Sequence, residues 1–368
     1  MHTTNPVTTR ETLCRIVEAA VLAPSAENLQ PWQFQVEDDS LVVSLDRSRQ
    51  LASDVDQMLG LTAIGTCIEN AVVAASTEGL RADVDFLAES LRSRSTPDYL
   101  PIARLGFLDG GVPDPLAAFI ESRCTSRRMD PRREVAEGML RELVQSCREH
   151  SDVTVHWVNA EQLWEFAELV GIGNRIRFEH RPFHEELYGS LRFTADEARR
   201  TRDGLDVATL QLPFGVASIM HVLRTWYRMK WANIAGFSRG VARQATQEVI
   251  RSGVVGFLTV PVPNIEHFVQ GGRALERLWL TATQLGLCFH PTASLPVFLA
   301  HARAGGHQLL PGHRQLAEGM SERFYRLFPS LAGRTIQMAF RIGYGPKPPV
   351  RTLRRPLTAV LDLNEREV

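Results

Sequence analysis

The sequence has few of the features that set a protein apart from ordinary globular chains. It has only five cysteines and no C-x-x-C pair, which argues against a disulfide framework or a thiolate zinc site and fits a reducing cytosol. No run approaches the roughly 18 apolar residues of a membrane span. The polar segment Met1–Arg10 lacks the apolar core of a signal peptide. We therefore expect a cytoplasmic location and no membrane partner.

An excess of charge of one sign is also missing. The 41 basic and 42 acidic residues give a net charge of −1, so nothing in the composition suggests a nucleic-acid partner. H-E-x-x-H and G-x-S-x-G do not occur, and residues 171–176 lack the third glycine of a dinucleotide-binding loop. His180 and His184 are four residues apart, but Arg181 lies between them, and we expect no metal site.

The chain is long, and it contains an internal repeat. Its 368 residues, 44% of them hydrophobic, are enough for two fused units. Residues 65–80 and 272–287 share the pattern G-x-x-[IL]-E-x-x-x-[VL]-x-A-x-x-x-G-L, which predicts two buried helices, each ended by a glycine. The shorter pattern R-[LI]-G-[FY] recurs at residues 104–107 and 341–344. We interpret both pairs as traces of a tandem duplication.

The two copies are predicted to divide at the Gly/Pro-rich break near residues 113–115. This gives a first half of residues 1–112 and a second half of residues 113–368. We expect an α+β fold, with helices against mostly antiparallel sheets and candidate strands at 40–45, 153–158 and 254–260. Residues 160–250 have no counterpart in the first half and are predicted to form a helical insertion. The sequence leaves open whether the insertion caps a pocket or packs as ordinary core helices.

Residues 23–32, APSAENLQPW, follow an apolar helical run and concentrate turn-forming and hydrogen-bonding side chains. Proline ends helices and fixes φ, and short polar side chains offer directional donors and acceptors. Such a set suits a planar ligand with polar edges, while a plain helix-to-strand turn with a buried tryptophan is the alternative. The candidate binding residues of this segment are Pro24, Ser25, Asn28 and Gln30.

Two basic segments are candidates for binding a phosphate. Arg123, Thr125 and Arg127 are spaced two residues apart, and arginine forks and hydroxyl groups bind phosphate well. Near the C-terminus, Lys347, Arg351, Arg354 and Arg355 follow the second R-[LI]-G-[FY] pattern. A solvated basic helix start and a flexible basic tail are the alternatives. His290, before Pro291, is interpreted as a turn residue.

The decamer resembles the P-S-x-x-N-x-Q-P-W motif of the nitroreductase family of FMN-dependent oxidoreductases. Over most of residues 10–360 the chain resembles the double-length Acg-type branch of that family. The resemblance implies FMN as cofactor and NAD(P)H as a possible electron donor. It also implies ping-pong hydride transfer to or from a flat small molecule such as a nitroaromatic, a quinone or a biosynthetic substrate. No side chain is assigned a catalytic role.

The resemblance also implies where the flavin binds. Family members are homodimers with flavin at the subunit interface, and their R-x-S-x-R opening is similar to Arg123, Thr125 and Arg127, with Thr125 in place of the serine and Cys124 as a departure. A basic residue after the family's i-G-Y-G strand corresponds to Arg354 or Arg355. Each half thus keeps what the other lacks. This implies one good site per chain between the halves of an intramolecular pseudo-dimer, which is either monomeric or paired once more.

A rival function also comes from the resemblance. Acg-type proteins have been viewed as flavin-sequestering, with a lid over the ring, and residues 180–250 are the candidate lid. In that case the chain is a storage protein with a catalytically weak FMN site. Two further segments, D-x-x-R at residues 46–49 and D-G-L at residues 203–205, are similar to Acg-type elements, and the sequence gives neither a chemical role.

Overall fold

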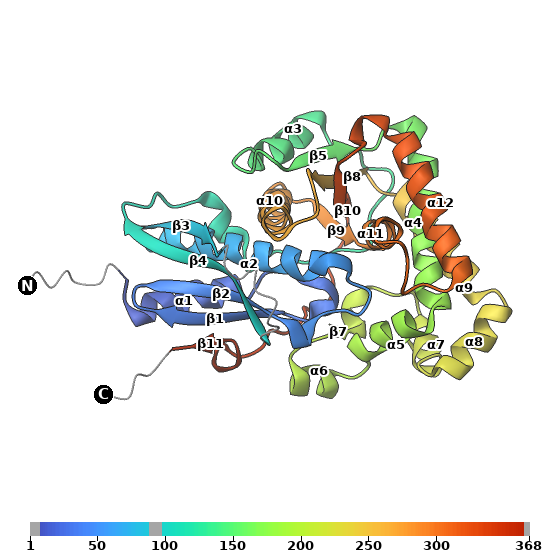
Figure 1. The fold of residues 1–368 in the computed structure, drawn as a ribbon, viewed down its shortest axis with the longest axis horizontal. Coiled ribbons are helices and arrows are strands. Elements are labelled where there is room, and N and C mark those ends of the chain that lie inside the picture. Colours follow the sequence, from blue (N-terminus) through green and yellow to red (C-terminus); the bar gives the residue numbers. More distant parts are fainter. Residues whose placement is uncertain (1–7, 88–97, 364–368) are drawn as a thin grey trace, which may run out of the picture.

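A five-stranded sheet forms the left part of the protein in Figure 1, a computed structural model that describes residues 8–87 and 98–363. Its strand order is β11-β1-β2-β4-β3. All neighbours are antiparallel except β1 and β11, which run parallel. The strands are β1 (Trp32–Glu37), β2 (Ser40–Asp46), β3 (Leu80–Phe86), β4 (Tyr99–Asp109) and β11 (Leu361–Asp362). A strand from the end of the described chain therefore completes a sheet built from its beginning.

The second sheet has four strands in the order β5-β8-β10-β9, all antiparallel. They are β5 (Thr154–Trp157), β8 (Val254–Val260), β9 (Cys288–Thr292) and β10 (Thr335–Gly343). The strands predicted at 40–45, 153–158 and 254–260 are confirmed as β2, β5 and β8. The mixed α+β class is confirmed as well. Each sheet is rich in β-branched residues bounded by turns, which is why local patterning identified these three strands.

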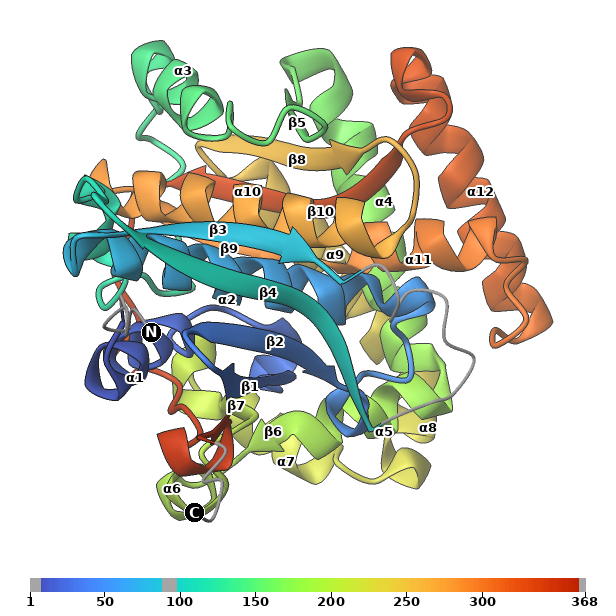
Figure 2. The ribbon, with the colours of Figure 1, turned by 60° about the vertical axis from the view of Figure 1, so that its left-hand side comes forward.

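Two long helices lie next to each other between the sheets, α2 (Met58–Thr77) and α10 (Ile265–Gln284) (Figures 1 and 2). They are the two helices that the long repeated pattern predicts. Gly79 and Gly286 adopt φ of 76° and 70° just beyond the helix ends, a left-handed conformation that glycine adopts without steric cost. The segment Val55–Thr77 is long and apolar enough to cross a membrane, but 94% of its apolar 18-residue window is buried inside the protein, as in a core helix.

Two shorter helices flank this pair, α1 (Arg10–Ala20) and α3 (Glu137–Ser146). Helix α1 begins at Thr9, whose hydroxyl accepts a hydrogen bond from the Thr12 amide at 3.2 Å, a standard way to satisfy the first free N–H groups of a helix. Its apolar face is buried. Pro24 lies shortly after the end of α1 and begins the turn that leads into β1. Trp32, at the start of β1, is fully buried, so it packs in the core rather than offering its face to a ligand.

The predicted insertion divides into two parts with different roles. Helices α4 (Ala160–Glu179) and α9 (Phe237–Ile250) pack with α11 (Ser294–Arg303) and α12 (Pro311–Leu327) on the outer side of the second sheet (Figure 1). Phe166 of α4 stacks on Phe257 of β8 with ring centroids 5.7 Å apart. This part belongs to the core. Of the two alternatives that the sequence left open, packing as core helices therefore applies to these two helices, and capping a pocket applies to the residues between them.

The middle of the insertion, residues 181–234, forms a separate small cluster at the lower right of Figure 1. It contains α5 (Arg181–Ser190), α6 (Ala195–Thr201), α7 (Val216–Val222) and α8 (Trp226–Ile234), with the short parallel strands β6 (Leu191–Arg192) and β7 (Leu205–Asp206). Its own apolar cluster includes Leu187, Leu223 and Met229. This unit lies against the turn of residues 23–32 and borders the cavity described next.

Candidate functional site

Two adjoining cavities lie where the two sheet-bearing parts of the chain meet. The main cavity has a volume of about 370 Å³ and the second about 350 Å³, both within the size range of ligand sites. They share five lining residues, which makes them two compartments of one site. The shared residues are Pro24, Ser25, Thr125, Arg127 and Leu205.

The main cavity is largely apolar. Leu59 and Ala63 of α2 form one wall, and Leu275 and Trp279 of α10 form another. The inner part of the insertion supplies the cover. Its lining residues are Phe178, Phe183, Leu187, Leu191, Leu205, Leu210 and Met220. A flat, apolar-faced ligand with few polar groups suits such walls.

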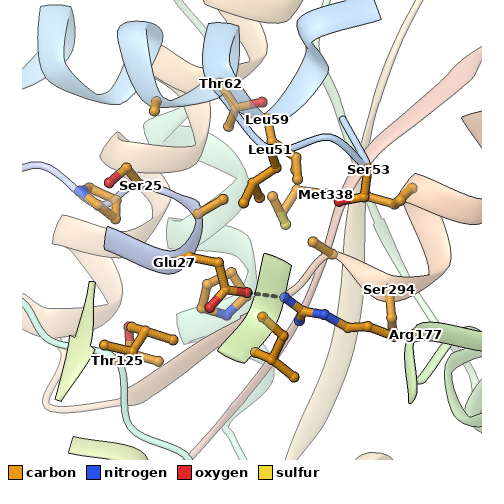
Figure 3. Close-up of a pocket in the computed structure, with 18 of the residues that line it drawn as sticks. Ser25, Glu27, Leu51, Ser53, Leu59, Thr62, Thr125, Arg177, Ser294 and Met338 are labelled. Carbon is orange, nitrogen blue, oxygen red and sulfur yellow. Dashed lines mark hydrogen bonds and ion pairs between the residues drawn. The ribbon is translucent and has the colours of Figure 1, made fainter. Parts of the chain in front are cut away.

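One ion pair stands inside this apolar cavity. Glu27, in the turn after α1, points toward Arg177 of α4 (Figure 3), and the two form a salt bridge. Burial disfavours the charge of Arg177, but the carboxylate of Glu27 outweighs that cost and raises the arginine's pKa. Glu27 adopts a positive φ of 50° within the short turn that carries it. The pair ties the turn to the insertion.

The second cavity is strongly basic. Five arginines line it, and no acidic residue does among the described part of the chain. They are Arg123, Arg127, Arg202, Arg351 and Arg354. The nearest compensating charge is Glu276 of α10, whose Oε1 lies 3.1 Å from Nε of Arg123. One buried carboxylate against several guanidinium groups leaves a local surplus of positive charge.

The pKa values of two of these arginines reflect that surplus. Burial, with the nearby charges of Arg123 and Arg351, lowers the pKa of Arg354 to about 9. Burial also lowers the pKa of Arg127 to about 10, although Glu27 acts in the opposite direction. A bound anion would favour the charged form of both groups. The arrangement is that of an anion site.

The predicted residues Arg123, Thr125 and Arg127 all line the second cavity, and the last two line the main cavity as well. Arg123 lies over the ring of Trp279, with 4.6 Å from its guanidinium carbon to the ring centroid. Arg127 Nη1 donates to the carbonyl of Thr209 at 3.0 Å. Thr125 forms an isolated parallel bridge with Phe289 beside β9. These side chains are thus brought together by an irregular, extended segment. The alternative of a solvated helix start does not apply.

The C-terminal basic residues separate into two groups. Arg351 and Arg354 line the second cavity, whereas Lys347 and Arg355 do not line either. Arg354 donates to the carbonyls of Val21, Leu22 and Ala23 at 2.8–3.0 Å, at the end of α1. Arg355 instead donates through Nη2 to the carbonyl of Ala359 at 2.7 Å. The structure places Arg354, and not Arg355, at the cavity.

Two polar residues of the decamer fasten other segments to the turn. Asn28 donates to the carbonyls of Gly204 and Leu353 at 2.9 and 3.1 Å, and its Oδ1 accepts from Arg354 at 3.0 Å. Gln30 is fully buried and lines neither cavity. Its Oε1 accepts from the amide of Arg355 at 2.8 Å, and its Nε2 donates to the carbonyl of Arg202. Pro24 and Ser25 line both cavities.

The two segments left without a role are joined to each other. Arg49, from D-x-x-R, lies 2.7 Å from the carboxylate of Asp203, from D-G-L. Arg192 pairs with the same carboxylate at 2.7 Å. Next along the chain, Gly204 exchanges hydrogen bonds with Asn28, and Leu205 lines both cavities. The ion pair therefore holds the insertion over the site. A contact between residues 154 positions apart carries no local sequence signal.

His290 is a site residue that the sequence interpretation missed. It lies in β9 rather than in a turn, so that expectation is wrong, and it lines the main cavity. Arg341 Nε donates to His290 Nδ1 at 2.8 Å, which leaves the proton on Nε2. Burial, with Arg341 and Arg127 nearby, lowers the pKa of His290 well below its ordinary value. The ring is a neutral hydrogen-bond donor, not a base waiting for a proton.

Comparison with known proteins finds one similar curated protein and several similar solved structures. No family model matches the chain. The chain is 26% identical over 352 residues to the uncharacterized protein MT1398 of Mycobacterium tuberculosis. The match covers 94% of this chain and 47% of that protein, so the chain spans about half the length of the curated relative it matches.

Among solved structures, the chain is similar to an FMN-dependent nitroreductase, NfnB, from Mycobacterium smegmatis in complex with NADPH. That match has 15% identity and a TM-score of 0.38 and covers 67% of this chain and 96% of the other. It is also similar to the FMN- and NADPH-dependent nitroreductase NfnB from Sphigopyxis sp. strain HMH. There the identity is 15% and the TM-score 0.40, with coverage of 68% and 98%.

Proposed function

We propose that this chain is an FMN-dependent oxidoreductase of the nitroreductase family, in its double-length Acg-type branch. The observation that carries the proposal is the pairing of two compartments. An arginine-lined cavity without an acidic lining residue opens beside an apolar cavity of similar volume. A ligand with a flat ring system joined by a short chain to a phosphate would match this pair, with its ring in the apolar cavity and its phosphate among the arginines. The P-S-x-x-N-x-Q-P-W segment lies at the junction of the two compartments.

The residues present fit such a group. Arg351, Arg127 and Thr125 offer charged and hydroxyl donors for a phosphate, and the buried Arg123 and the half-buried Arg354 line the same compartment. Ser25 and Pro24 stand at the passage to the main cavity, where the apolar side chains of α2 and α10 would face a ring. The lowered pKa values of Arg127 and Arg354, caused chiefly by burial, support the proposal, because a bound anion would favour their charged forms.

FMN, when bound, supplies ping-pong hydride exchange between NAD(P)H and a flat acceptor such as a nitroaromatic, a quinone or a biosynthetic substrate. The chain's own residues then have three tasks. The apolar cover from residues 178–220 excludes water. The Glu27–Arg177 pair fixes the turn against α4. His290, neutral and with its proton on Nε2, presents a donor in the cavity without adding charge. None of these residues needs to act as a nucleophile.

We infer that the site arises from a fused pair of related halves, residues 1–112 and 113–368. In each half a helix that ends in Gly-Leu leads into an edge strand, β3 or β9. That strand pairs antiparallel with the strand carrying R-[LI]-G-[FY], β4 or β10. The turn of residues 23–32 comes from one half, and Arg123, Thr125 and Arg127 come from the other. One chain would thus supply both faces of the interface site.

A second candidate function has its own supporting observation. Seven apolar side chains from residues 178–220 line the main cavity, and the Arg49–Asp203 and Asn28–Gly204 contacts fasten this cover in place. A cover that never opens would make the chain a flavin-sequestering protein. Both functions need the same two cavities, and reduction of the bound flavin by a nicotinamide distinguishes them.

The purified protein tests both. We expect it to be yellow, with the visible absorbance of oxidised flavin, and we expect NADPH or NADH to bleach it without oxygen. Bleaching by dithionite but by neither nicotinamide would favour sequestration. A colourless protein that takes up no added FMN would contradict both proposals.

A further inference from the structure

The outer face of the insertion is unusually apolar and basic. Six of the fourteen large hydrophobic side chains exposed in the described part of the chain lie within residues 214–234. They are Phe214, Ile219, Val222, Tyr227, Trp231 and Ile234. We call this set the outer patch. It lies on α7 and α8 and the turn before them, at the edge of the molecule in Figure 1.

The outer patch follows helical spacing. Tyr227, Trp231 and Ile234 are four and three residues apart on α8 and form one stripe. The rings of Tyr227 and Trp231 are in contact, with centroids 6.4 Å apart. Met229, on the opposite side of the same helix, is fully buried in the small cluster below. Helix α8 therefore has two apolar faces, and only one of them is packed.

The chain segment that carries the outer patch has charges of one sign, although Glu197 of α6 lies near its Arg224. Residues 207–247 contain five lysines and arginines and no aspartate or glutamate. The basic residues are Arg224, Arg228, Lys230, Arg239 and Arg243, and all are exposed. None of the five forms an ion pair with a carboxylate within the described residues, in contrast to many other surface arginines. The remaining 327 residues carry 36 basic and 42 acidic side chains, a net charge of −6.

We propose that the outer patch docks on an anionic phospholipid membrane surface. Interfacial helices combine lysine and arginine with tryptophan and aliphatic side chains in this way: the rings and aliphatic groups enter the headgroup boundary while the basic groups meet lipid phosphates. The proposal is independent of what the cavities bind. It departs from the sequence-based expectation of no membrane partner, which considered only spanning segments.

Other occupants fit the outer patch less well. A two-fold contact with a second copy would bring each patch against itself and set five unpaired cations against five more. A single-stranded nucleic acid would use stacking rings and phosphates, but Ile219, Val222 and Ile234 offer it nothing. An anionic membrane uses both the aliphatic and the basic groups.

Co-sedimentation with vesicles tests the proposal. The full-length protein is mixed with vesicles of phosphatidylglycerol and phosphatidylcholine, or of phosphatidylcholine alone. We expect binding to the anionic vesicles only, weakened by salt. Each basic residue near such a surface contributes roughly five-fold in partitioning, so the double variant Arg228→Gln/Lys230→Gln should bind roughly 25-fold more weakly. The control Arg326→Gln changes an exposed arginine of α12 and should bind like the parent.

The apolar contribution is tested with Trp231→Ser/Ile234→Ser. Trp164→Ser is the matched control, because Trp164 and Trp231 are both 58% exposed and Trp164 lies outside the outer patch. We expect the double variant to lose most of its binding and the control to lose none. Absence of binding to anionic vesicles by the parent protein would overturn the proposal. So would a dimer, measured by analytical ultracentrifugation without lipid, that the same double variant dissociates, or binding to oligo-dT in place of vesicles.

Discussion

Gly65 of α2 and Gly272 of α10 lie face to face where the two helices cross. A Cβ atom added to Gly65 would lie 2.8 Å from the Cα of Gly272, and one added to Gly272 would lie 2.9 Å from the Cα of Gly65. Real Cβ atoms do not approach so closely. The two glycines occupy the same position of the repeated motif, so the contact joins equivalent points of the two copies. The small residue is needed there for the helices to touch backbone to backbone.

Gly272→Ala should therefore destabilise the protein. Alanine in a helix is favoured over glycine by about 1 kcal/mol, but the overpacking at the crossing should cost roughly 1–3 kcal/mol or more. Urea unfolding measures the difference. Gly319→Ala is the matched control, because Gly319 lies within α12 with nothing within 4 Å of its added Cβ and should gain stability. A stable Gly272→Ala protein would mean that the helices do not meet this closely.

Arg351→Gln should weaken FMN binding without unfolding the protein. Arg351 is exposed, and its Nη2 donates to the carbonyl of Arg123 at 2.6 Å. A hydrogen bond to a charged group contributes about 1.5–3 kcal/mol, which is roughly ten- to hundred-fold in affinity. Riboflavin lacks the phosphate, so its affinity should not change. Lys347→Gln, nearby but outside both cavity linings, is the control. An equal loss for FMN and riboflavin would contradict a phosphate site.

Substitutions at Asn28 should affect the phosphate end of the site more than the ring end. Asn28 lines the second cavity and accepts a hydrogen bond from Arg354. Asn28→Gly removes these contacts. Asn28→Ala removes them too, and it places alanine, which tolerates the left-handed region less well than asparagine or glycine, at φ of 53°, a strain of about 1–2 kcal/mol relative to glycine. Both should bind FMN more weakly than the parent, and alanine should lower stability further. Unchanged FMN affinity in Asn28→Gly would show that the contacts to Arg354 do not matter.

His290 should make the protein less stable in mild acid. An unfolded histidine binds its proton near pH 6.5, whereas folded His290 stays neutral well below that pH. Between these two pKa values the unfolded chain binds more protons, so the free energy of unfolding rises with pH and is lost as the pH falls. The slope per proton is about 1.4 kcal/mol per pH unit. His290→Gln, which keeps an acceptor for Arg341, should remove one such contribution in urea unfolding between pH 6.5 and 5. Identical slopes would contradict the assignment.

The parts of the fold that sequence could predict are those set by local chemistry. Strand β8 lies at the predicted residues because a β-branched run bounded by turns has one favourable conformation. Helices α2 and α10 end where glycine permits a left-handed residue. The choice between Arg354 and Arg355 had no such basis, because adjacent side chains in an extended arm point to different sides and only the folded neighbours decide which side faces the cavity.

Long-range contacts account for what the sequence did not reveal. Gln30 belongs to a motif whose polar residues all looked available to a ligand, yet its amide is taken up by Arg202 and Arg355. Asp203 is bound by Arg49 across 154 positions. The insertion was predicted as one unit because none of residues 160–250 has a counterpart in the first half. Only packing shows that α4 lies in the core and that α8 keeps one apolar face outside.

The parallel pairing of β11 with β1 means that the first sheet is completed only late in synthesis. The first sheet lacks its edge strand until Leu361 and Asp362 have been translated, and the segment just before them carries Arg351 and Arg354. During synthesis, β1 therefore has no partner on its outer edge until the last described residues have been added. A nascent chain stalled before residue 350 would hold α1, β1 and β2 without Arg354, whose guanidinium donates to the carbonyls just after α1.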